Sequence, residues 1–285
     1  MDALSRLGRS TRLSVMAVAV ALALATAGVV VAANPQALHI ITPTSDSQIT
    51  NIDVLRLEIK NYYGDPTGTG VFAPDSYYAQ EAEGVAAKGD RWLAARMNAQ
   101  APSGMKAIVL DVDDTTLATW NYEIAVNWAY TPASNAVFVT GQLFPAVPGM
   151  VDLVTAAAAD GYAIFFITGR PASQEAATLG NLTSDGIGVD AGYPVPTTLS
   201  NGLDGLFTKP SVGSYPTYLD KPEFCADAIA ASKSCATIQY KSGTRAYIES
   251  LGYEIVANFG DQYSDLQGGY ANKTFKLPNP NYYLP

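Results

Sequence analysis

The sequence predicts an α/β fold in which helices pack on a largely parallel sheet. The continuous apolar run at residues 107–110 is typical of a strand that is buried on both faces, as parallel strands are, and similar, mainly apolar runs of five to seven residues recur later in the chain. Stretches with helical spacing separate some of these runs, and polar residues directly follow each run. The runs lie at residues 107–110, 162–167, 236–240 and 253–259.

Residues 1–33 are typical of an export signal. Three arginines precede an uncharged stretch rich in Ala, Val and Leu, and small residues allow cleavage after Ala27 or after Ala33. The alternative is an uncleaved membrane anchor, since the stretch approaches the ~20 residues that span a bilayer. Its alanine richness favours cleavage, which predicts a secreted protein with no stable membrane association.

Residues 34–105 are predicted to form an arm, over residues 34–50, followed by a helical extension. Apolar residues spaced three or four apart indicate a first helix that ends at residues 64–66. A second helix is expected over residues 75–98, before a break at residues 102–104. The expected apolar stripe of the first helix is Ile52, Leu55, Ile59 and Tyr62, and the candidate core residues of the second are Tyr78, Val85, Trp92, Leu93 and Met97.

The main domain is expected over residues 106–285, with helices at residues 150–159 and 243–251 between its strands. Residues 118–148 interrupt the alternation, and we expect this aromatic-rich insertion to lie over the sheet as a small cap. Four of its aromatic residues have two open roles, which are stacking on a ring of a substrate and forming the insertion's own small core. These residues are Trp120, Tyr122, Trp128 and Tyr130.

The scarcity of histidine and cysteine restricts the chemistry. One histidine, His39, excludes an all-histidine zinc site, and neither Cys225 nor Cys235 has the arginine six residues later that a Cys-x5-Arg phosphatase loop requires. Without residues 1–33 the chain carries 14 basic and 25 acidic side chains, a net formal charge of −11. This charge argues against binding to nucleic acid duplexes or anionic lipid. Catalysis is therefore expected to depend on carboxylates, hydroxyls, Lys, Arg or a bound ion.

The two cysteines have two open states. Export favours a disulfide between Cys225 and Cys235. In a continuous helix their ten-residue spacing would separate the Cα atoms by ~15 Å, whereas a disulfide requires less than about 7 Å. A disulfide therefore requires a turn within residues 226–234, and the alternative is two reduced, buried thiols.

Each predicted strand is followed by polar residues suited to phosphate or metal chemistry. Each signal is weak alone, but ligands bind at the carboxyl ends of the strands in open α/β sheets, so the four together predict one site. In chain order they are Asp111 and Asp113, then Thr168, Gly169 and Arg170, then Lys241, and finally Asp261 and Asp265.

These residue types indicate phosphoryl transfer. Asp111 and Asp113 are two apart, so both carboxylates emerge on one side, where a hard divalent cation relieves their repulsion and Asp261 is a natural third ligand. Asp111 is expected to attack phosphorus and form an aspartyl-phosphate. Asp113 is expected to protonate the leaving oxygen and then activate water. Thr168 and nearby N–H groups are expected to hold phosphoryl oxygens, and Lys241 to stabilise their charge.

Four strings resemble the haloacid dehalogenase (HAD) superfamily of phosphotransferases, namely AIVLDVDDTTL, FFITGRP, YKSGTR and GYEIVANFGDQYSDLQGG. More narrowly, the chain resembles the exported class B/C-like acid phosphatases, which include the bacterial class C enzymes and the plant vegetative storage proteins. The closing KLPNPNYYLP is similar to that group as well. The resemblance covers residues 50–285 and implies a Rossmann-like HAD core that hydrolyses small phosphate monoesters.

The resemblance also implies a Mg²⁺ site formed by Asp111, the backbone carbonyl of Asp113, and Asp261, with Asp265 acting through a metal-bound water. Asp114 departs from the pattern, because the acid phosphatases usually carry Glu there.

Some roles stay open at this point. Arg170 either contacts the substrate phosphate, together with Thr168, Gly169 and Lys241, or pairs with a carboxylate of the insertion. The alternative functions are a storage or binding protein with little turnover on the same fold, and phosphotransfer to an acceptor other than water. The presence of the nucleophile, Asp111, favours the phosphatase over the storage protein.

Overall fold

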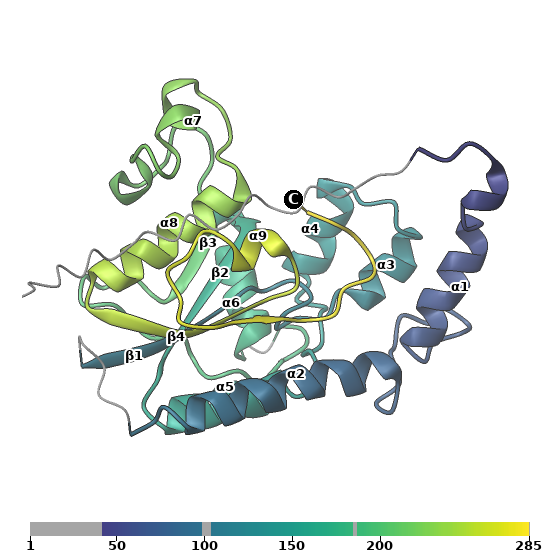
Figure 1. Ribbon diagram of the computed structural model, residues 1–285, viewed down its shortest axis with the longest axis horizontal. Helices are drawn as coiled ribbons and strands as arrows, with labels where there is room; N and C mark the ends of the chain where they lie inside the picture. The colour runs from purple at the N-terminus through teal and green to yellow at the C-terminus, as the bar shows by residue number, and fades with distance from the viewer. Residues whose placement is uncertain (1–41, 99–103, 185–186, 285) are drawn as a thin grey trace, which may run out of the picture. The chain divides into compact units, whose positions relative to one another are not determined.

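Five parallel strands form one sheet in the computed structural model, which describes residues 42–98, 104–184 and 187–284 (Figure 1). The strand order is β3-β2-β1-β4-β5, and every neighbouring pair is parallel. The predicted α/β fold with a parallel sheet is confirmed. The strands are β1 (Met105–Leu110), β2 (Ala163–Pro171), β3 (Leu206–Lys209), β4 (Tyr253–Gly260) and β5 (Thr274–Lys276).

The predicted export signal, its two cleavage positions and His39 lie outside the described residues. Among the residues that are described, no helix is long and apolar enough to span a bilayer.

Strand β1 lies at the centre of the sheet and supplies both hydrophobic cores. Ile108 and Leu110 pack into the core on one face, whereas Ala107 and Val109 pack into the core on the other. This alternation follows from the two-residue period of a strand, and it explains why residues 107–110 read as a continuous apolar run.

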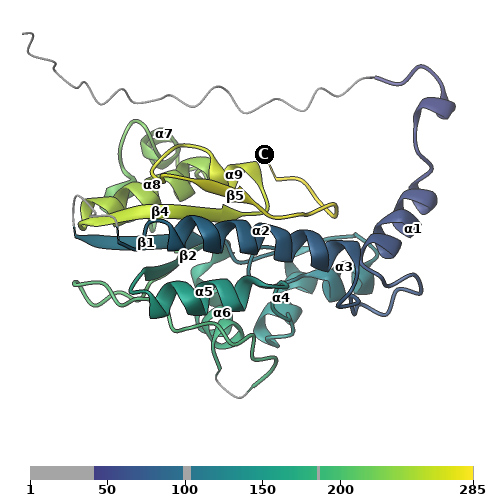
Figure 2. The same cartoon turned by 60° about the horizontal axis from the view of Figure 1, so that its bottom comes forward.

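Helices cover both faces of the sheet (Figure 2). One face is covered by α2 (Tyr77–Ala94), α5 (Met150–Ala159) and α6 (Glu175–Leu182), and the other by α7 (Ala226–Ala230) and α8 (Thr237–Ser250). Helix α2 approaches the sheet closely at Gly89, where an added Cβ would lie 2.6 Å from the ring of Phe259. A glycine inside this helix thus permits its packing on β4.

The predicted strand at residues 236–240 is wrong, because these residues lie at the start of α8. Tyr240, Thr244 and Ile248 are buried at intervals of four residues, which is a helical period. The short apolar run did not distinguish the two structures. A different segment, β3, forms the remaining strand next to β2. It has only four residues, of which two are buried, so its apolar signal is weak.

Both predicted N-terminal helices are present, but the residues that they bury differ from those expected. Helix α1 (Ile52–Tyr62) has no buried residue, and only Ile59 and Tyr62 of its stripe pack against an aromatic cluster, while Ile52 and Leu55 are exposed. In α2, Tyr78 and Leu93 are buried, whereas the expected core residue Met97 lies beyond the end of the helix and is exposed.

The insertion contains α3 (Trp120–Val126) and α4 (Pro132–Thr140). Trp120 lies in the aromatic cluster of the N-terminal helices, where its ring stacks on Tyr63 with centroids 4.1 Å apart. Its indole Nε1 donates to the buried carboxylate of Asp65. Trp120 therefore packs against the N-terminal extension. It does not belong to a separate core formed by the insertion alone.

Cys225 and Cys235 form a disulfide, with Cα atoms 5.4 Å apart. Helix α7 lies between them and ends at Ala230, and Ser232 then adopts a left-handed φ of +52°. The disulfide alternative, together with the turn that it requires, is confirmed.

Candidate active site

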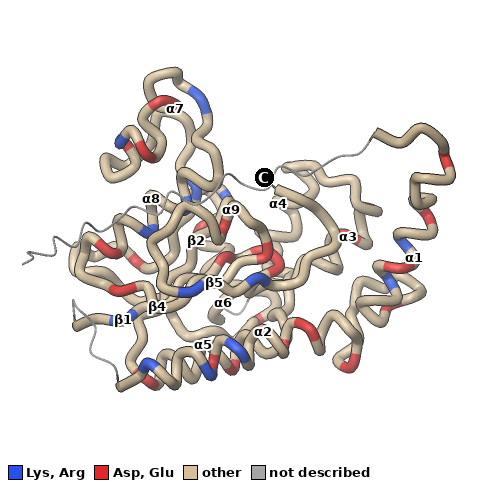
Figure 3. Tube along the Cα trace, in the orientation of Figure 1, with Lys and Arg blue, Asp and Glu red and all other residues tan. Residues whose placement is uncertain are grey.

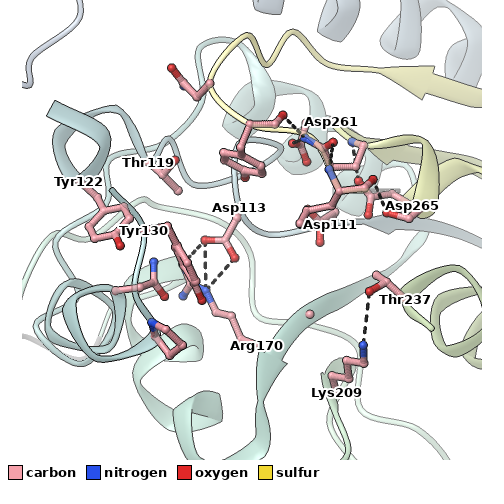
Figure 4. A pocket seen from close by; sticks show the side chains of 18 of the residues that line it. Asp111, Asp113, Thr119, Tyr122, Tyr130, Arg170, Lys209, Thr237, Asp261 and Asp265 are labelled. Atoms are coloured by element: carbon pink, nitrogen blue, oxygen red, sulfur yellow. Dashed lines mark hydrogen bonds and ion pairs between the residues drawn. The ribbon is translucent and has the colours of Figure 1, made fainter. Parts of the chain in front are cut away.

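A cavity of about 470 Å³ lies where the carboxyl ends of β1, β2 and β4 meet the insertion (Figure 4). Asp111 follows β1, Arg170 lies at the end of β2, and Asp261 follows β4, so residues far apart in the chain share one cavity. Acidic residues gather at this edge of the sheet beside α9 (Tyr263–Leu266) (Figure 3). The predicted convergence of the strand ends is present in the structure.

Three buried carboxylates form a compact cluster in the cavity. One oxygen each of Asp111, Asp261 and Asp265 lies within 4.8 Å of the others. Burial, followed by the charge of Asp265, raises the pKa of Asp111 well above its usual range and that of Asp261 to about 7. Three crowded oxygen donors whose ionisation is opposed in this way fit a hard divalent cation, which would offset their charge.

Lys241 reaches this cluster from the first turns of α8. Its buried Nζ forms an ion pair with Asp111 and another, 2.6 Å long, with Asp265. Burial lowers the pKa of Lys241, but the charges of Asp111 and Asp265 outweigh it and raise that pKa above its ordinary value. Lys241 is therefore a fixed positive charge beside Asp111. The structure brings Lys241 to the cavity beside Asp111, but from a helix and not from the predicted strand end.

Asp113 lies apart from the three clustered carboxylates and pairs with Arg170. The guanidinium donates from Nη2 at 2.7 Å and from Nε at 3.1 Å to the Asp113 carboxylate, and Nη1 donates to Thr178 at 3.0 Å. Arg170 thus pairs with a carboxylate, as one alternative expected, but with Asp113 and not with one from the insertion. Only the backbone carbonyl of Asp113 was expected to bind metal, and that stays a prediction.

The three expected phosphate-binding residues of β2 do not all reach the cavity. Gly169 and Arg170 line the cavity. Thr168 is fully buried and does not line it, and its Oγ1 accepts a hydrogen bond from the N–H of Arg170. Direct contact between Thr168 and a substrate therefore stays a prediction.

Asp114 holds the loop after β1 in place. It adopts φ +53° and is buried, and its carboxylate accepts hydrogen bonds from the Thr119 hydroxyl at 2.6 Å and the Thr119 N–H at 3.0 Å. Burial raises its pKa to about 7. Asp114 thereby connects the Asp-rich loop to the start of α3, a role that sequence reasoning did not assign.

The C-terminal segment supplies site residues that sequence reasoning missed. The Asn279 side chain donates to Asp261 Oδ2 at 2.7 Å. Asn281 connects the amino-terminal helices to the insertion, because it donates to the hydroxyl of Tyr63 and accepts from the indole of Trp128. The string KLPNPNYYLP was the available signal, but it did not indicate which residues reach the cavity.

Two further charged residues of the cavity were also missed. Lys209, at the end of β3, donates to the Thr237 hydroxyl at 3.3 Å, and burial lowers its pKa. Glu123 lies on α3, is 5% exposed, and lines the cavity. Burial, followed by the charge of Asp113, raises the pKa of Glu123 to about 7. A single Glu among aromatic residues carries no sequence signal for a site.

Comparisons with known proteins agree with this architecture. The chain is 30% identical to "Stem 28 kDa glycoprotein" of Glycine max over 142 residues, which are 49% of this chain and 44% of that protein. It is 26% identical to "Acid phosphatase 1" of Solanum lycopersicum over 64% of this chain and 60% of that protein. The chain thus spans less than two thirds of the length of either relative.

A solved structure, that of the class C acid phosphatase from Bacillus anthracis, has the same fold. The TM-score is 0.52 at 19% identity, over 73% of this chain and 80% of that one. A family model described as HAD superfamily, subfamily IIIB (acid phosphatase), matches residues 71–206 and 223–285. Because this match covers well over half of the sequence, the chain belongs to the acid phosphatases of HAD subfamily IIIB.

Proposed function

We propose that this protein is an exported phosphate monoester hydrolase that depends on Mg²⁺ and forms an aspartyl-phosphate on Asp111. The observation that carries the proposal is the surroundings of Asp111. Its carboxylate is ion-paired with Lys241 and lies beside two other buried carboxylates at the carboxyl edge of a parallel sheet. Membership in the acid phosphatase subfamily supports the same reaction, and the composition of residues 1–33 supports export.

In the first step, an oxygen of Asp111 attacks the phosphorus atom of the monoester, and the bond from phosphorus to the leaving oxygen breaks. Asp113 in its protonated form donates its proton to that oxygen, which leaves as an alcohol. Two nitrogens of Arg170 hold the Asp113 carboxyl, so its orientation in the cavity is restricted.

In the second step, a water oxygen attacks the phosphorus of the aspartyl-phosphate while Asp113 accepts a proton from that water. The bond between phosphorus and Asp111 breaks, inorganic phosphate leaves, and Asp111 and Asp113 return to their starting forms. The ammonium group of Lys241 stabilises negative charge on the phosphoryl oxygens in both steps. Gly169, Arg170 and, through its hydroxyl, Thr168 are the further proposed contacts to those oxygens.

The proposed ligands of Mg²⁺ are the carboxylates of Asp111, Asp261 and Asp265 and the backbone carbonyl of Asp113. When bound, the ion supplies positive charge that offsets the clustered carboxylates and the incoming phosphoryl group.

The test is phosphate release from an aryl phosphate, measured with and without EDTA, for the wild type and for Asp111→Asn. We expect EDTA to abolish turnover and added Mg²⁺ to restore it, and Asp111→Asn to lose on the order of 10³-fold or more in kcat. Asp152→Asn, an exposed residue of α5, is the matched control and is expected to retain wild-type activity.

Turnover that resists EDTA, or that persists undiminished in Asp111→Asn, would contradict the mechanism. A folded wild-type protein that releases no phosphate from any ester would instead favour the storage or binding alternative.

A further inference from the structure

Glu123 is a buried acidic side chain in the cavity that the proposed mechanism does not use. It lies on α3, is 5% exposed, and forms part of the cavity wall. Its carboxylate has no hydrogen bond or ion pair with any residue of the described ranges 42–98, 104–184 and 187–284. Without a partner on the protein, the ionised form of a buried carboxyl group is unfavourable, because burial reduces its hydration.

The other acidic side chains that line the cavity all have partners. Asp111 and Asp265 are ion-paired with Lys241, Asp113 is ion-paired with Arg170, and Asp261 accepts from Asn279 and Gln262.

None of the basic side chains that line the cavity pairs with Glu123 in the described part of the chain. Arg170 and Lys241 are held in ion pairs, and Lys209 donates to Thr237. A partner for Glu123 therefore comes from the cavity itself, as water or as a bound molecule that displaces it.

The neighbourhood of Glu123 favours a cation. The cavity wall carries five acidic and three basic side chains, so acidic groups outnumber basic ones in this cavity. Trp128 and Tyr130 line the same cavity, and Tyr130 is 62% exposed. The faces of aromatic rings attract cations, and ammonium groups in particular. A neutral hydroxyl would donate one hydrogen bond to the ionised form of Glu123 but would leave the charge of that form uncompensated.

We propose that Glu123 binds an ammonium group on the leaving alcohol, so that the preferred substrates are phosphate monoesters of amino alcohols. This inference rests on the proposed function. In that mechanism Asp113 protonates the leaving oxygen, and Glu123 lines the same cavity as Asp113, from α3 of the insertion. Because Lys241 and the residues of β2 are the proposed contacts of the phosphoryl group, we assign the group that Glu123 contacts to the leaving alcohol.

The test compares kcat/KM for 2-aminoethyl phosphate with that for n-propyl phosphate, which has the same chain length but no charge. For the wild type we expect the ammonium ester to be preferred by about 10- to 100-fold, the range for a buried charge-assisted hydrogen bond. In Glu123→Gln the preference is expected to fall at least about tenfold. Glu58→Gln, an exposed residue of α1, is the matched control and is expected to keep the wild-type preference.

A second measurement does not depend on the fold of the variant. Ethanolamine is expected to compete with an aryl phosphate on the wild-type enzyme at least about tenfold more strongly than 1-propanol. Equal inhibition by the two alcohols, or a preference that is unchanged in a folded Glu123→Gln protein, would overturn the proposal. If 2-hydroxyethyl phosphate is used as efficiently as the ammonium ester, the assignment of a cation is wrong.

These results are distinguishable from failure of the proposed function. If the enzyme hydrolyses aryl and propyl phosphates without preferring the ammonium ester, the proposed function stands and the role of Glu123 is refuted. If no ester releases phosphate, the proposed function itself is refuted.

Discussion

Replacing Glu123 by Gln is expected to stabilise the folded protein in a pH-dependent way. Burial raises the pKa of this carboxyl from an ordinary 4.5 to about 7 in the folded state. The folded protein therefore binds this proton more tightly than the unfolded chain does. The resulting stabilisation is complete below pH 4.5 and is lost as the pH rises through about 7. Gln is neutral at every pH, so residue 123 of the variant makes no pH-dependent contribution to the unfolding free energy over this interval.

The magnitude follows from the two pKa values. One pKa unit corresponds to about 1.4 kcal/mol, so the raised pKa implies a loss of about 3 kcal/mol over the whole interval. Between pH 5 and pH 8 the expected part of this loss is about 2.5 kcal/mol, because some of it occurs below pH 5. Glu123 is almost fully buried, so solvent screening does not reduce the effect substantially.

The assay is urea unfolding of the wild type, Glu123→Gln and the exposed control Glu58→Gln at pH 5 and pH 8, with EDTA present. The difference in unfolding free energy between Glu123→Gln and the wild type is expected to shift in favour of the variant by about 2.5 kcal/mol from pH 5 to pH 8. Asp114 and Asp261 also have raised pKa values, but they titrate in both proteins and cancel in this difference. An equal difference at the two pH values would refute the assigned pKa.

Two further predictions concern the metal site and the packing of α2. Asn279→Ala removes the 2.7 Å hydrogen bond to Asp261, and we expect the Mg²⁺ concentration for half-maximal activity of EDTA-treated protein to rise about 10- to 100-fold. An unchanged Mg²⁺ requirement would show that Asn279 does not position Asp261. Gly89→Ala is expected to lower the unfolding free energy by about 1–3 kcal/mol, because its Cβ would overlap the ring of Phe259. Gly84→Ala in the same helix meets no atom within 4 Å and is expected to be stabilising by up to ~1 kcal/mol, so equal effects in urea unfolding would contradict this account.

Much of the fold was predictable because long apolar runs mark buried parallel strands. The predicted runs at residues 107–110, 162–167 and 253–259 correspond to β1, β2 and β4, and the helix at residues 150–159 was correct. The run at residues 236–240 was misassigned because a segment of five residues, of which only Ala236, Ile238 and Tyr240 are apolar, suits the start of a buried helix as well as a strand.

The position of Lys241 was nevertheless predicted, for a reason that does not depend on the element. The start of α8 lies at the same edge of the sheet as the ends of β1 and β4, so a side chain there reaches Asp111 from a helix. Assigning Lys241 to a strand and not to a helix therefore did not change the edge of the sheet at which it was expected.

The sequence by itself determined which chemical groups meet at this edge of the sheet. Asp111, Arg170 and Asp261 each lie at a strand end, and parallel strands bring their carboxyl ends together whatever the details of packing. Only the tertiary structure decided which groups pair. Asp113 pairs with Arg170, while Glu123 is buried without a partner among the described residues, because burial and pairing depend on how the insertion packs over the strands. Such contacts join residues distant in the chain, and no local pattern encodes them.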